Sequence, residues 1–159
     1  MKKKRDLRVR KAKPSDLNSM LGLLSLLFSI EKDFFFNEAR QCRGLVQMLE
    51  YQMAEVLVAE SRNRVIGMCT GQLVISTAEG GYSLLVEDLV VEPSSRGQRV
   101  GRILLDKLER WAVGKGATRL QLLADKSNKK GLGFYTKNGW QRTNLICLLK
   151  KPEVKDNDF

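Results

Sequence analysis

The spacing of hydrophobic positions divides the first half of the chain into strand-like and helix-like segments. Residues 7–13 alternate apolar and basic side chains, as a short strand does, and Pro14 ends the run. Apolar residues then recur at three- and four-residue spacing over residues 17–28, which predicts an amphipathic helix. A second, weaker helical pattern covers residues 37–53. The period then changes to that of strands over 55–61, 64–77 and 82–92, and short polar turns between them predict an antiparallel meander.

The second half of the chain alternates helical and strand patterns. A helix follows Gly101, with Leu104 and Leu108 on its apolar face, and it ends at Gly114. The remaining predicted elements are a strand at 119–125, a short helix at 129–139, and one or two final strands within 140–151.

The length and composition fit one domain. The chain has 159 residues, of which 43% are hydrophobic and 29% are charged, as is ordinary for a globular protein. We expect one domain over residues 1–151, with a basic extension at 1–6 and a polar tail at 152–159. The longest apolar stretch, residues 20–30, is too short to span a bilayer, so no membrane association is expected.

The net charge of +10 is concentrated at the N-terminus. Residues 1–13 hold eight of the 28 basic residues and one of the 18 acidic residues, so they carry +7 and leave +3 for the rest. A basic tail on a nearly balanced domain is weak support for a nucleic-acid binder, and no nucleic-acid partner is expected. A basic nucleic-acid-binding domain is kept as the least favoured alternative.

The chain contains no histidine, which excludes Ser-His-Asp and Cys-His catalysis and histidine-ligated metal sites. Acid–base chemistry must use carboxylates, tyrosine, lysine or cysteine. Cys42, Cys69 and Cys147 are too scattered for a disulfide framework or a zinc site. We interpret all three as small core residues of a reduced, cytoplasmic protein without a bound metal.

A turn with two glycines joins the predicted strand at 82–92 to the helix that follows Gly101. Backbone N–H groups and the dipole at a helix start bind anions. The Walker and dinucleotide patterns do not fit, since Gly97 and Gly101 are separated by three residues. The turn therefore predicts a diphosphate site of another kind, with positive charge added by three arginines: Arg96, Arg99 and Arg102.

Two motifs resemble the GNAT superfamily of acetyl-CoA-dependent N-acetyltransferases. Residues 96–101, RGQRVG, are similar to its [Q/R]-x-x-G-x-[G/A] signature, with Arg99 in place of the central glycine. Residues 128–140 are similar to Asn-x-x-Ala-x-x-x-Tyr-x-x-x-Gly-Phe, with Gly131 and Trp140 as departures. The resemblance implies an α/β (α+β) fold, with a mixed, mostly antiparallel sheet of six to seven strands flanked by about four helices.

The resemblance implies acetyl-CoA as cosubstrate and no metal. It places the pyrophosphate on the backbone of residues 98–101 and the pantetheine arm along residues 89–91. Asn128 is implied as a coenzyme contact, or it serves as a helix N-cap, and both roles are compatible. The implied acetyl-CoA-binding residues are Leu89, Val90, Val91, Arg96, Gly97, Gln98, Arg99, Val100, Gly101, Arg102, Asn128 and Tyr135.

The resemblance also implies the catalytic residues. Tyr135 matches the tyrosine that protonates the leaving thiolate, although a core aromatic role is the alternative. An alkylamine with a pKa of about 10.4 is roughly three pH units from neutral at pH 7, so a base is needed. Glu87 and Asp88 are the candidates, and strand alternation turns them to opposite faces, with Glu87 preferred. The alternative interpretation is that one or both carboxylates form structural ion pairs.

The implied reaction is direct acetyl transfer to a primary amine, on a small molecule, a polyamine or a protein. Related polyamine acetyltransferases carry a similar Glu-Asp pair. Leu123 stands where ribosomal-protein N-terminal acetyltransferases usually have a glutamate, which disfavours that substrate class. Glu31, Asp33 and Glu38 are either attractive to a cationic amine or part of a solvated loop. A catalytically silent CoA-binding or sensing module is the alternative function, and a homodimer is left open.

Overall fold

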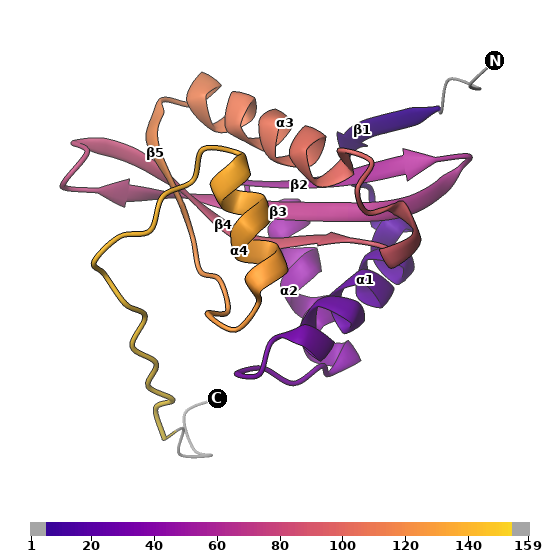
Figure 1. The fold of residues 1–159 in the computed structure, drawn as a ribbon, viewed down its shortest axis with the longest axis horizontal. Helices are drawn as coiled ribbons and strands as arrows, with labels where there is room; N and C mark the ends of the chain where they lie inside the picture. The colour runs from indigo at the N-terminus through magenta and orange to yellow at the C-terminus, as the bar shows by residue number, and fades with distance from the viewer. Residues whose placement is uncertain (1–5, 154–159) are drawn as a thin grey trace.

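A five-stranded sheet runs through the centre of the computed structural model, in the order β1-β2-β3-β4-β5 (Figure 1). The structure describes residues 6–153, so almost all of the predicted basic extension and most of the predicted polar tail lie outside the described residues. Neighbouring strands from β1 to β4 are antiparallel, whereas β5 pairs with β4 in parallel. The strands are β1 (Leu7–Lys11), β2 (Ala54–Ser61), β3 (Arg64–Ser76), β4 (Gly81–Val91) and β5 (Ala117–Leu122).

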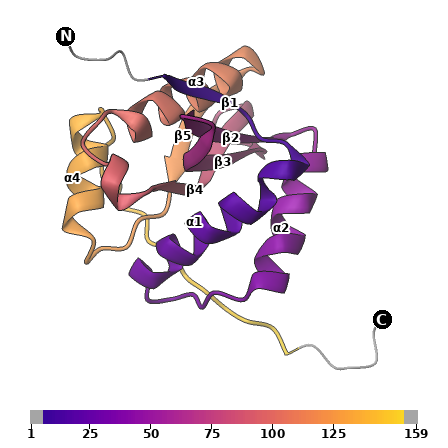
Figure 2. The same cartoon turned by 90° about the vertical axis from the view of Figure 1, so that its right-hand side faces the viewer.

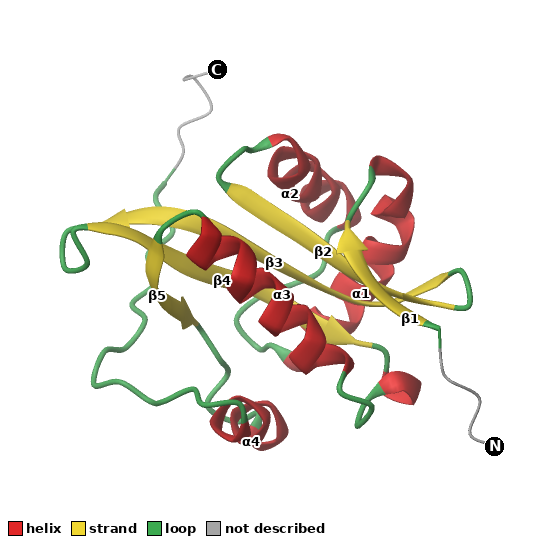
Figure 3. Cartoon of the chain, turned by 90° about the horizontal axis from the view of Figure 1, so that it is seen from above, coloured by secondary structure: helices red, strands yellow, loops and turns green. Residues whose placement is uncertain are grey.

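Helices cover both faces of this sheet. Figure 3 shows α1 and α2 on one side of the sheet and α3 on the other. The α4 helix packs on the α3 side through Phe134 and Tyr135, which contact the core of that face. Every helix in the described residues is too short or too polar to cross a membrane. The helices are α1 (Leu17–Ile30), α2 (Glu38–Glu50), α3 (Val100–Gly114) and α4 (Lys129–Lys137), with 3-10 turns at Pro14–Asp16 and Pro93–Ser95.

Strand alternation divides the core into two apolar layers. Leu57 on β2 packs in the layer with α3, whereas its neighbour Val58 packs in the layer with α1. The apolar face predicted for α3 is confirmed, because Leu104 and Leu108 are completely buried. The buried faces of the helices therefore hold the sheet between them.

The predicted fold class is confirmed, with four α-helices around a mixed, mostly antiparallel sheet. The predicted count of six to seven strands is wrong, since the sheet of the described residues has five. The missing strands were expected within residues 140–151, but residues 141–151 are exposed and form no strand. A strand needs a partner for its backbone groups, and this segment has none among the described residues.

The cysteines differ from the prediction in one case. Cys69 is completely buried on β3, as expected, and Cys42 is half-buried on α2. Cys147 is exposed, so the prediction of a core role for it is wrong. The cause is the same as for the strand count, because Cys147 lies in the segment that joins no sheet.

Candidate active site

A β-bulge in β4 determines where the two predicted carboxylates lie. Gly71 pairs with Val86 and Thr70 pairs with Asp88, so Glu87 is the extra residue in the β4 ladder. Glu87 is exposed, whereas the Asp88 carboxylate accepts a hydrogen bond of 2.7 Å from the buried Thr70 hydroxyl. The bulge thus interrupts the simple alternation that the sequence suggested. It directs the Asp88 carboxylate to Thr70 of β3 and leaves Glu87 exposed.

The part of β4 beyond the bulge has an open edge. Pairing with β5 ends at Val86 and Leu122, so residues 87–91 have no strand on that side among the described residues. Glu92 donates its backbone N–H to the Ile66 carbonyl of β3, and alternation turns the backbone groups of Leu89 and Val91 the other way. We call residues 87–91 the open edge of β4. An extended ligand arm could hydrogen-bond there as an added strand does.

The predicted diphosphate turn connects the open edge of β4 to α3. In the described chain, the backbone N–H groups of Val100, Gly101 and Arg102 donate to no protein acceptor, as is usual at a helix start. The exposed Arg96 side chain folds back on the end of β4, where its Nε donates to the Val91 carbonyl at 2.9 Å. Arg102 Nε lies 3.7 Å from an Asp106 carboxylate oxygen. The turn therefore presents backbone donors with partly engaged arginines around them.

Arg99 adopts a backbone conformation that favours glycine. Its φ of 65° lies in the left-handed region, next to Gly97 at 72°. A side chain there costs about 1 kcal/mol or more relative to glycine. The arginine that replaces the central glycine of the family motif thus keeps the glycine conformation and adds a charge at the start of α3.

Close packing brings α4 to this turn. A Cβ placed on Gly101 would lie 3.2 Å from Phe134 Cζ and 3.8 Å from Val91 Cγ2, so only glycine fits easily between α4 and β4. At the start of α4, Asn128 caps the helix by accepting the Gly131 backbone N–H at 3.0 Å. A Cβ on Gly131 would lie 2.7 Å from Asn128 Nδ2, so this glycine leaves room for the cap. Asn128 therefore has its expected cap role.

Tyr135 on α4 is half-buried between two other aromatic rings. Its ring makes edge contacts with Phe134 and Trp140, at centroid distances of 5.4 and 5.9 Å. Within the described chain no residue hydrogen-bonds its hydroxyl. Burial, assisted by the negative charge of Glu31, raises the pKa of Tyr135 to about 12. The phenol is therefore neutral at physiological pH, and its O–H is available to a ligand.

Beside the open edge of β4, carboxylates from four segments lie close enough to shift the pKa values of Glu31 and Asp88. Burial, with a contribution from Glu87, raises the pKa of Asp88 to about 6, although the Thr70 hydrogen bond opposes this. Burial and the charges of neighbouring carboxylates raise the pKa of Glu31, at the end of α1, to about 7. These neighbours, in decreasing order of effect, are Asp88, Glu87, Asp125 and Asp33. The sequence singled out Glu31, but its coupling to residues of β4 had no local signal.

The loop between α1 and α2 lies close to the segment between β5 and α4. The pKa of Asp125 is lowered by hydrogen bonds from Ser127, with smaller effects from the backbone and charge of Lys32. Next to Lys32, three phenylalanines are partly or largely exposed, and Phe34 packs against Phe28 of α1 at 6.2 Å between ring centroids. The surroundings of Glu31 thus combine negative charge with exposed aromatic surface.

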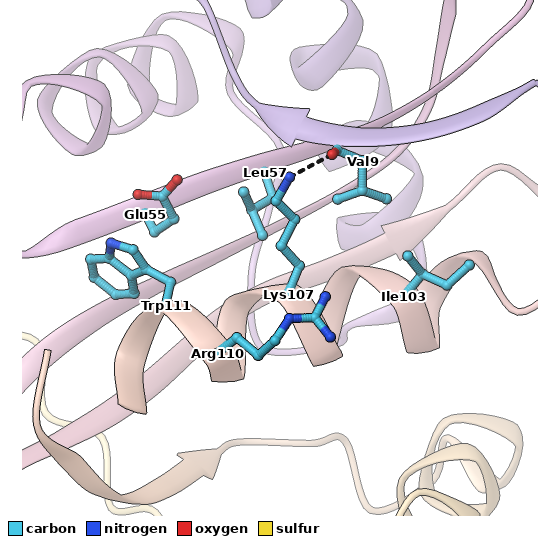
Figure 4. Close-up of a pocket in the computed structure, with 7 residues that line it drawn as sticks. All are labelled: Val9, Glu55, Leu57, Ile103, Lys107, Arg110 and Trp111. Atoms are coloured by element: carbon cyan, nitrogen blue, oxygen red, sulfur yellow. Dashed lines mark hydrogen bonds between the residues drawn. The ribbon is translucent and has the colours of Figure 1, made fainter. Parts of the chain in front are cut away.

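A separate hollow of about 510 Å³ lies between α3 and the first two strands (Figure 4). Lys107 crosses it and donates a hydrogen bond of 2.7 Å to the Val9 carbonyl. None of the predicted site residues lines this hollow. In the described chain, no group of three or more His, Cys, Asp or Glu side chains could hold a metal ion. The open edge of β4 is therefore the better candidate for the chemistry.

Comparison with known proteins gives a family match over most of the chain. The model of the acetyltransferase (GNAT) family matches residues 24–140. A thialysine N-epsilon-acetyltransferase from Bos taurus is 29% identical over 142 residues, which cover 84% of this chain and 83% of that protein.

Solved structures with the same fold agree with this match. An aminoglycoside N-acetyltransferase in complex with CoA has a TM-score of 0.83 at 16% identity, with 95% of this chain and 98% of that chain covered. An acetyltransferase from Trypanosoma brucei has a TM-score of 0.72 at 26% identity, with 92% and 100% covered.

Proposed function

The chain belongs to the acetyltransferase (GNAT) family and is an acyltransferase, and from this premise we propose that it transfers an acetyl group from acetyl-CoA to a primary amine. One observation carries the proposal. The open edge of β4, the first turn of α3 and the aromatic face of α4 meet around Gly101, which lies close to both Val91 and Phe134. A donor with an anionic head and a neutral arm could use all three.

Acetyl-CoA is the proposed acyl donor, and the described residues fit its chemistry. The backbone N–H groups of Val100, Gly101 and Arg102 suit a pyrophosphate, since they have no protein acceptor and lie at a helix start. The Leu89 backbone groups and the Val91 N–H suit the amides of a pantetheine arm, whereas the Val91 carbonyl already accepts a hydrogen bond from Arg96. Arg99 and Arg102 are exposed and would add attraction for phosphate. The aminoglycoside acetyltransferase solved with CoA supports this choice of donor.

Tyr135 is the proposed donor to the leaving sulfur. A thiol has a pKa of about 8.5, so full proton transfer from a phenol with a pKa of about 12 is uphill. The neutral hydroxyl instead donates a hydrogen bond as negative charge develops on sulfur. A cationic amine beside Glu31 would offset the charge that raises the pKa of Tyr135, and so would make the phenol a stronger acid during the reaction.

The amine must lose a proton before or as it attacks the thioester. Glu87 is the proposed base, acting directly or through water, because it is exposed at the bulge where the open edge begins. Asp88 is the second candidate, and its carboxylate is engaged by Thr70. The electron pair of the neutral nitrogen then attacks the thioester carbon and forms the new C–N bond. The C–S bond breaks, its electron pair leaves with sulfur as the thiolate, and the nitrogen releases its second proton to the thiolate or to water. No cysteine is used as an acyl carrier.

The proposed acceptor carries a positive charge close to the reacting amine or on it. Half-buried Glu31 and its acidic neighbours would attract such a group. The exposed Phe34 to Phe36 run would contact an apolar arm. The relative named for thialysine, an amino acid with a side-chain amine, supports a small amine of this type.

A binding and a kinetic measurement together test the reaction. We expect calorimetry to detect acetyl-CoA binding, and we expect an amine screen with thialysine, polyamines and aminoglycosides to give turnover. Tyr135→Phe should lower kcat by about 10²–10⁴-fold while changing acetyl-CoA affinity little, because the hydrogen bond to sulfur forms mainly in the transition state. Unchanged kcat would remove Tyr135 from the mechanism.

Two charge variants test whether the arginines at the start of α3 contribute to acetyl-CoA binding. Arg99→Gly with Arg102→Ala should weaken acetyl-CoA binding, whereas Arg43→Ala with Arg110→Ala removes the same charge elsewhere and should not. Glycine is chosen at 99 because it keeps the left-handed backbone. Absence of binding to the unmodified protein would overturn the proposed donor. Binding without turnover on any amine would favour the silent CoA-binding module instead.

Glu31→Gln tests the acceptor site. The pKa of Glu31 is raised to about 7, so its carboxylate gains negative charge as pH rises through that value. The kcat/KM for a cationic amine should therefore contain a rising step near pH 7 that the variant lacks, and the KM should increase about tenfold, or about 1.4 kcal/mol. Glu38→Gln, at the exposed start of α2, is the matched control and should preserve the step.

A further inference from the structure

The hollow between α3 and the first two strands contains a buried carboxylate that the proposed reaction does not use. Glu55 on β2 lines this hollow of about 510 Å³, and its side chain is 9% exposed. Among the described residues its partner is Lys11, whose Nζ lies 3.5 Å from a Glu55 carboxylate oxygen. A charge-assisted hydrogen bond is usually about 2.7–2.9 Å long. The Glu55 carboxylate therefore keeps acceptor capacity at a position with little access to water.

The strand register explains why Glu55 lacks stronger partners. On one side it pairs with Gly71 of β3, which has no side chain to supply a donor. On the other side the β1 ladder ends at Lys11, opposite Leu57, so β2 extends past β1 at Glu55. The Lys11 side chain that reaches toward the carboxylate is itself 65% exposed. Burying a carboxylate without full pairing destabilises a fold, and a bound donor would offset that cost.

Positive and apolar groups complete the walls of the hollow. Lys107 of α3 donates one N–H of its ammonium group to the Val9 carbonyl at 2.7 Å, which leaves two N–H groups for other acceptors. Arg110, on the next turn of α3, is exposed and also lines the hollow. The volume lies within the range of small-molecule sites, about 300–1,000 Å³. The apolar lining residues are Val9, Leu57, Ile103 and Trp111.

The order of these groups along the hollow selects the kind of ligand. Figure 4 shows Glu55 and Trp111 together at one end, Ile103 toward the other end and the Lys107 side chain between them. The positive charges of Lys107 and Arg110 oppose a simple cation, and Glu55 opposes a simple anion. A molecule that carries an ammonium group, a carboxylate and an apolar side chain satisfies both signs of charge and the apolar walls.

We propose that this hollow is a second binding site, for a free α-amino acid with an apolar side chain. The ammonium group donates to the Glu55 carboxylate, and the ligand carboxylate accepts from Lys107, with added attraction from Arg110. The apolar side chain packs against Leu57 and Ile103. The residues proposed for acetyl-CoA and for the amine do not line this hollow, so the site is separate from the proposed active site.

Calorimetry with matched probes tests the ligand class. L-phenylalanine carries both charges and an apolar side chain, phenethylamine lacks the carboxylate, and 3-phenylpropionate lacks the ammonium group. We expect L-phenylalanine to bind at least about tenfold more tightly than either of the other two, because only it satisfies Glu55 and Lys107 together. L-leucine should bind as well. Absence of binding by both amino acids up to millimolar concentrations, or a singly charged probe that binds as tightly as L-phenylalanine, overturns the proposal.

Two substitutions assign the two charges of the ligand. Glu55→Gln should weaken the binding of L-phenylalanine about tenfold and should not weaken that of 3-phenylpropionate. Lys107→Gln should weaken both of these probes about tenfold and should not weaken phenethylamine. Glu109→Gln and Lys115→Gln are the matched controls, since both residues are exposed and lie outside the hollow, and neither should change any affinity. Unchanged binding of L-phenylalanine in Glu55→Gln or in Lys107→Gln contradicts the proposed contacts.

Trp111 reports whether the ligand occupies the hollow. The chain has two tryptophans, so Trp140→Phe leaves Trp111, which lines the hollow, as the single fluorophore of its kind. L-phenylalanine should change its emission over the same concentrations as in calorimetry. Glu31→Gln, at the proposed amine site, should leave the affinity unchanged.

Two results would place the ligand elsewhere and overturn the proposed site. One is calorimetric binding without a change in Trp111 emission, and the other is loss of binding in Glu31→Gln. None of these readouts uses acetyl-CoA or turnover, so the result is independent of the proposed reaction.

Discussion

Two apolar runs in this chain have the pattern of strands, but only one of them forms a strand. Residues 84–91 lie inside the sheet as part of β4, with β3 on one side and β5 along the first half of the other. Residues 145–149 lie outside any element, although four of their five side chains are large and aliphatic. Leu84 is completely buried, whereas Leu148 is 86% exposed.

The difference shows that hydrophobic pattern selects strand geometry but does not supply a partner. The β4 strand has β3 next to it in sequence, joined by a hairpin turn that contains Gly80 in the left-handed region. The run at 145–149 follows α4 and has no adjacent hairpin. Its partner must come from a distant part of the chain or from another molecule. Substitutions in and beside the two runs make this comparison sharper.

The largest expected effect is on the free energy of unfolding, and it should differ between one leucine of each run. Leu84→Ala should lower the free energy of unfolding by about 2–5 kcal/mol, because it leaves a cavity in the core. Leu148→Ala should change the free energy of unfolding by less than about 0.5 kcal/mol, because the Leu148 side chain is 86% exposed. Denaturant titrations of both variants measure these changes. An equal loss for Leu148→Ala would contradict the exposed placement of the segment.

An intermediate effect on stability is expected from the half-buried Asp88 carboxylate of β4. The pKa of Asp88 is raised from 3.8 to about 6, so the folded protein holds this proton more tightly than the unfolded chain does. Its favourable contribution is complete below pH 3.8 and is lost as pH rises through 6. Asp88→Asn should therefore be more stable than the unmodified protein above pH 6, by about 1–3 kcal/mol, with no gain near pH 4.

Thermal unfolding from pH 4 to pH 8 measures the Asp88 effect. Asp106→Asn, at a half-exposed position on α3, removes one carboxylate charge elsewhere and is the matched control. A constant difference between Asp88→Asn and the unmodified protein across this range would mean that Asp88 does not titrate as expected. The run at 145–149 contains no carboxylate, so only β4 loses stability through ionisation of a carboxylate as pH rises.

The smallest expected effects on stability come from substitutions in the turns that border the two runs. Arg99, in the turn after β4, has a φ of 65°, and Gly139, before the C-terminal segment, has a φ of 86°. Arg99→Gly should stabilise the fold by about 1 kcal/mol, whereas Gly139→Ala should destabilise it by about the same amount. Denaturation midpoints at equal slopes test both signs. A loss of stability in Arg99→Gly would indicate that the arginine side chain makes a compensating contact.

Local patterns determined most of the secondary structure and the order of the candidate site. The antiparallel meander of β2 to β4, the apolar face of α3 and the turn at 96–101 all follow from residues close together in sequence. The two glycine-containing motifs likewise indicated the GNAT family, and the family match over residues 24–140 confirms that assignment. These features depend on period, turn chemistry and helix starts, which a sequence carries directly.

Only the tertiary structure decided how distant segments act on one another. The bulge that separates Glu87 from Asp88 depends on the register between β3 and β4, which no single strand specifies. The raised pKa of Glu31 depends first on burial in the folded chain and then on carboxylates, most of which lie more than fifty residues away along the chain. The exposure of residues 145–149 depends on whether a sheet edge lies within reach. In each case the energy comes from groups that only the folded chain brings together.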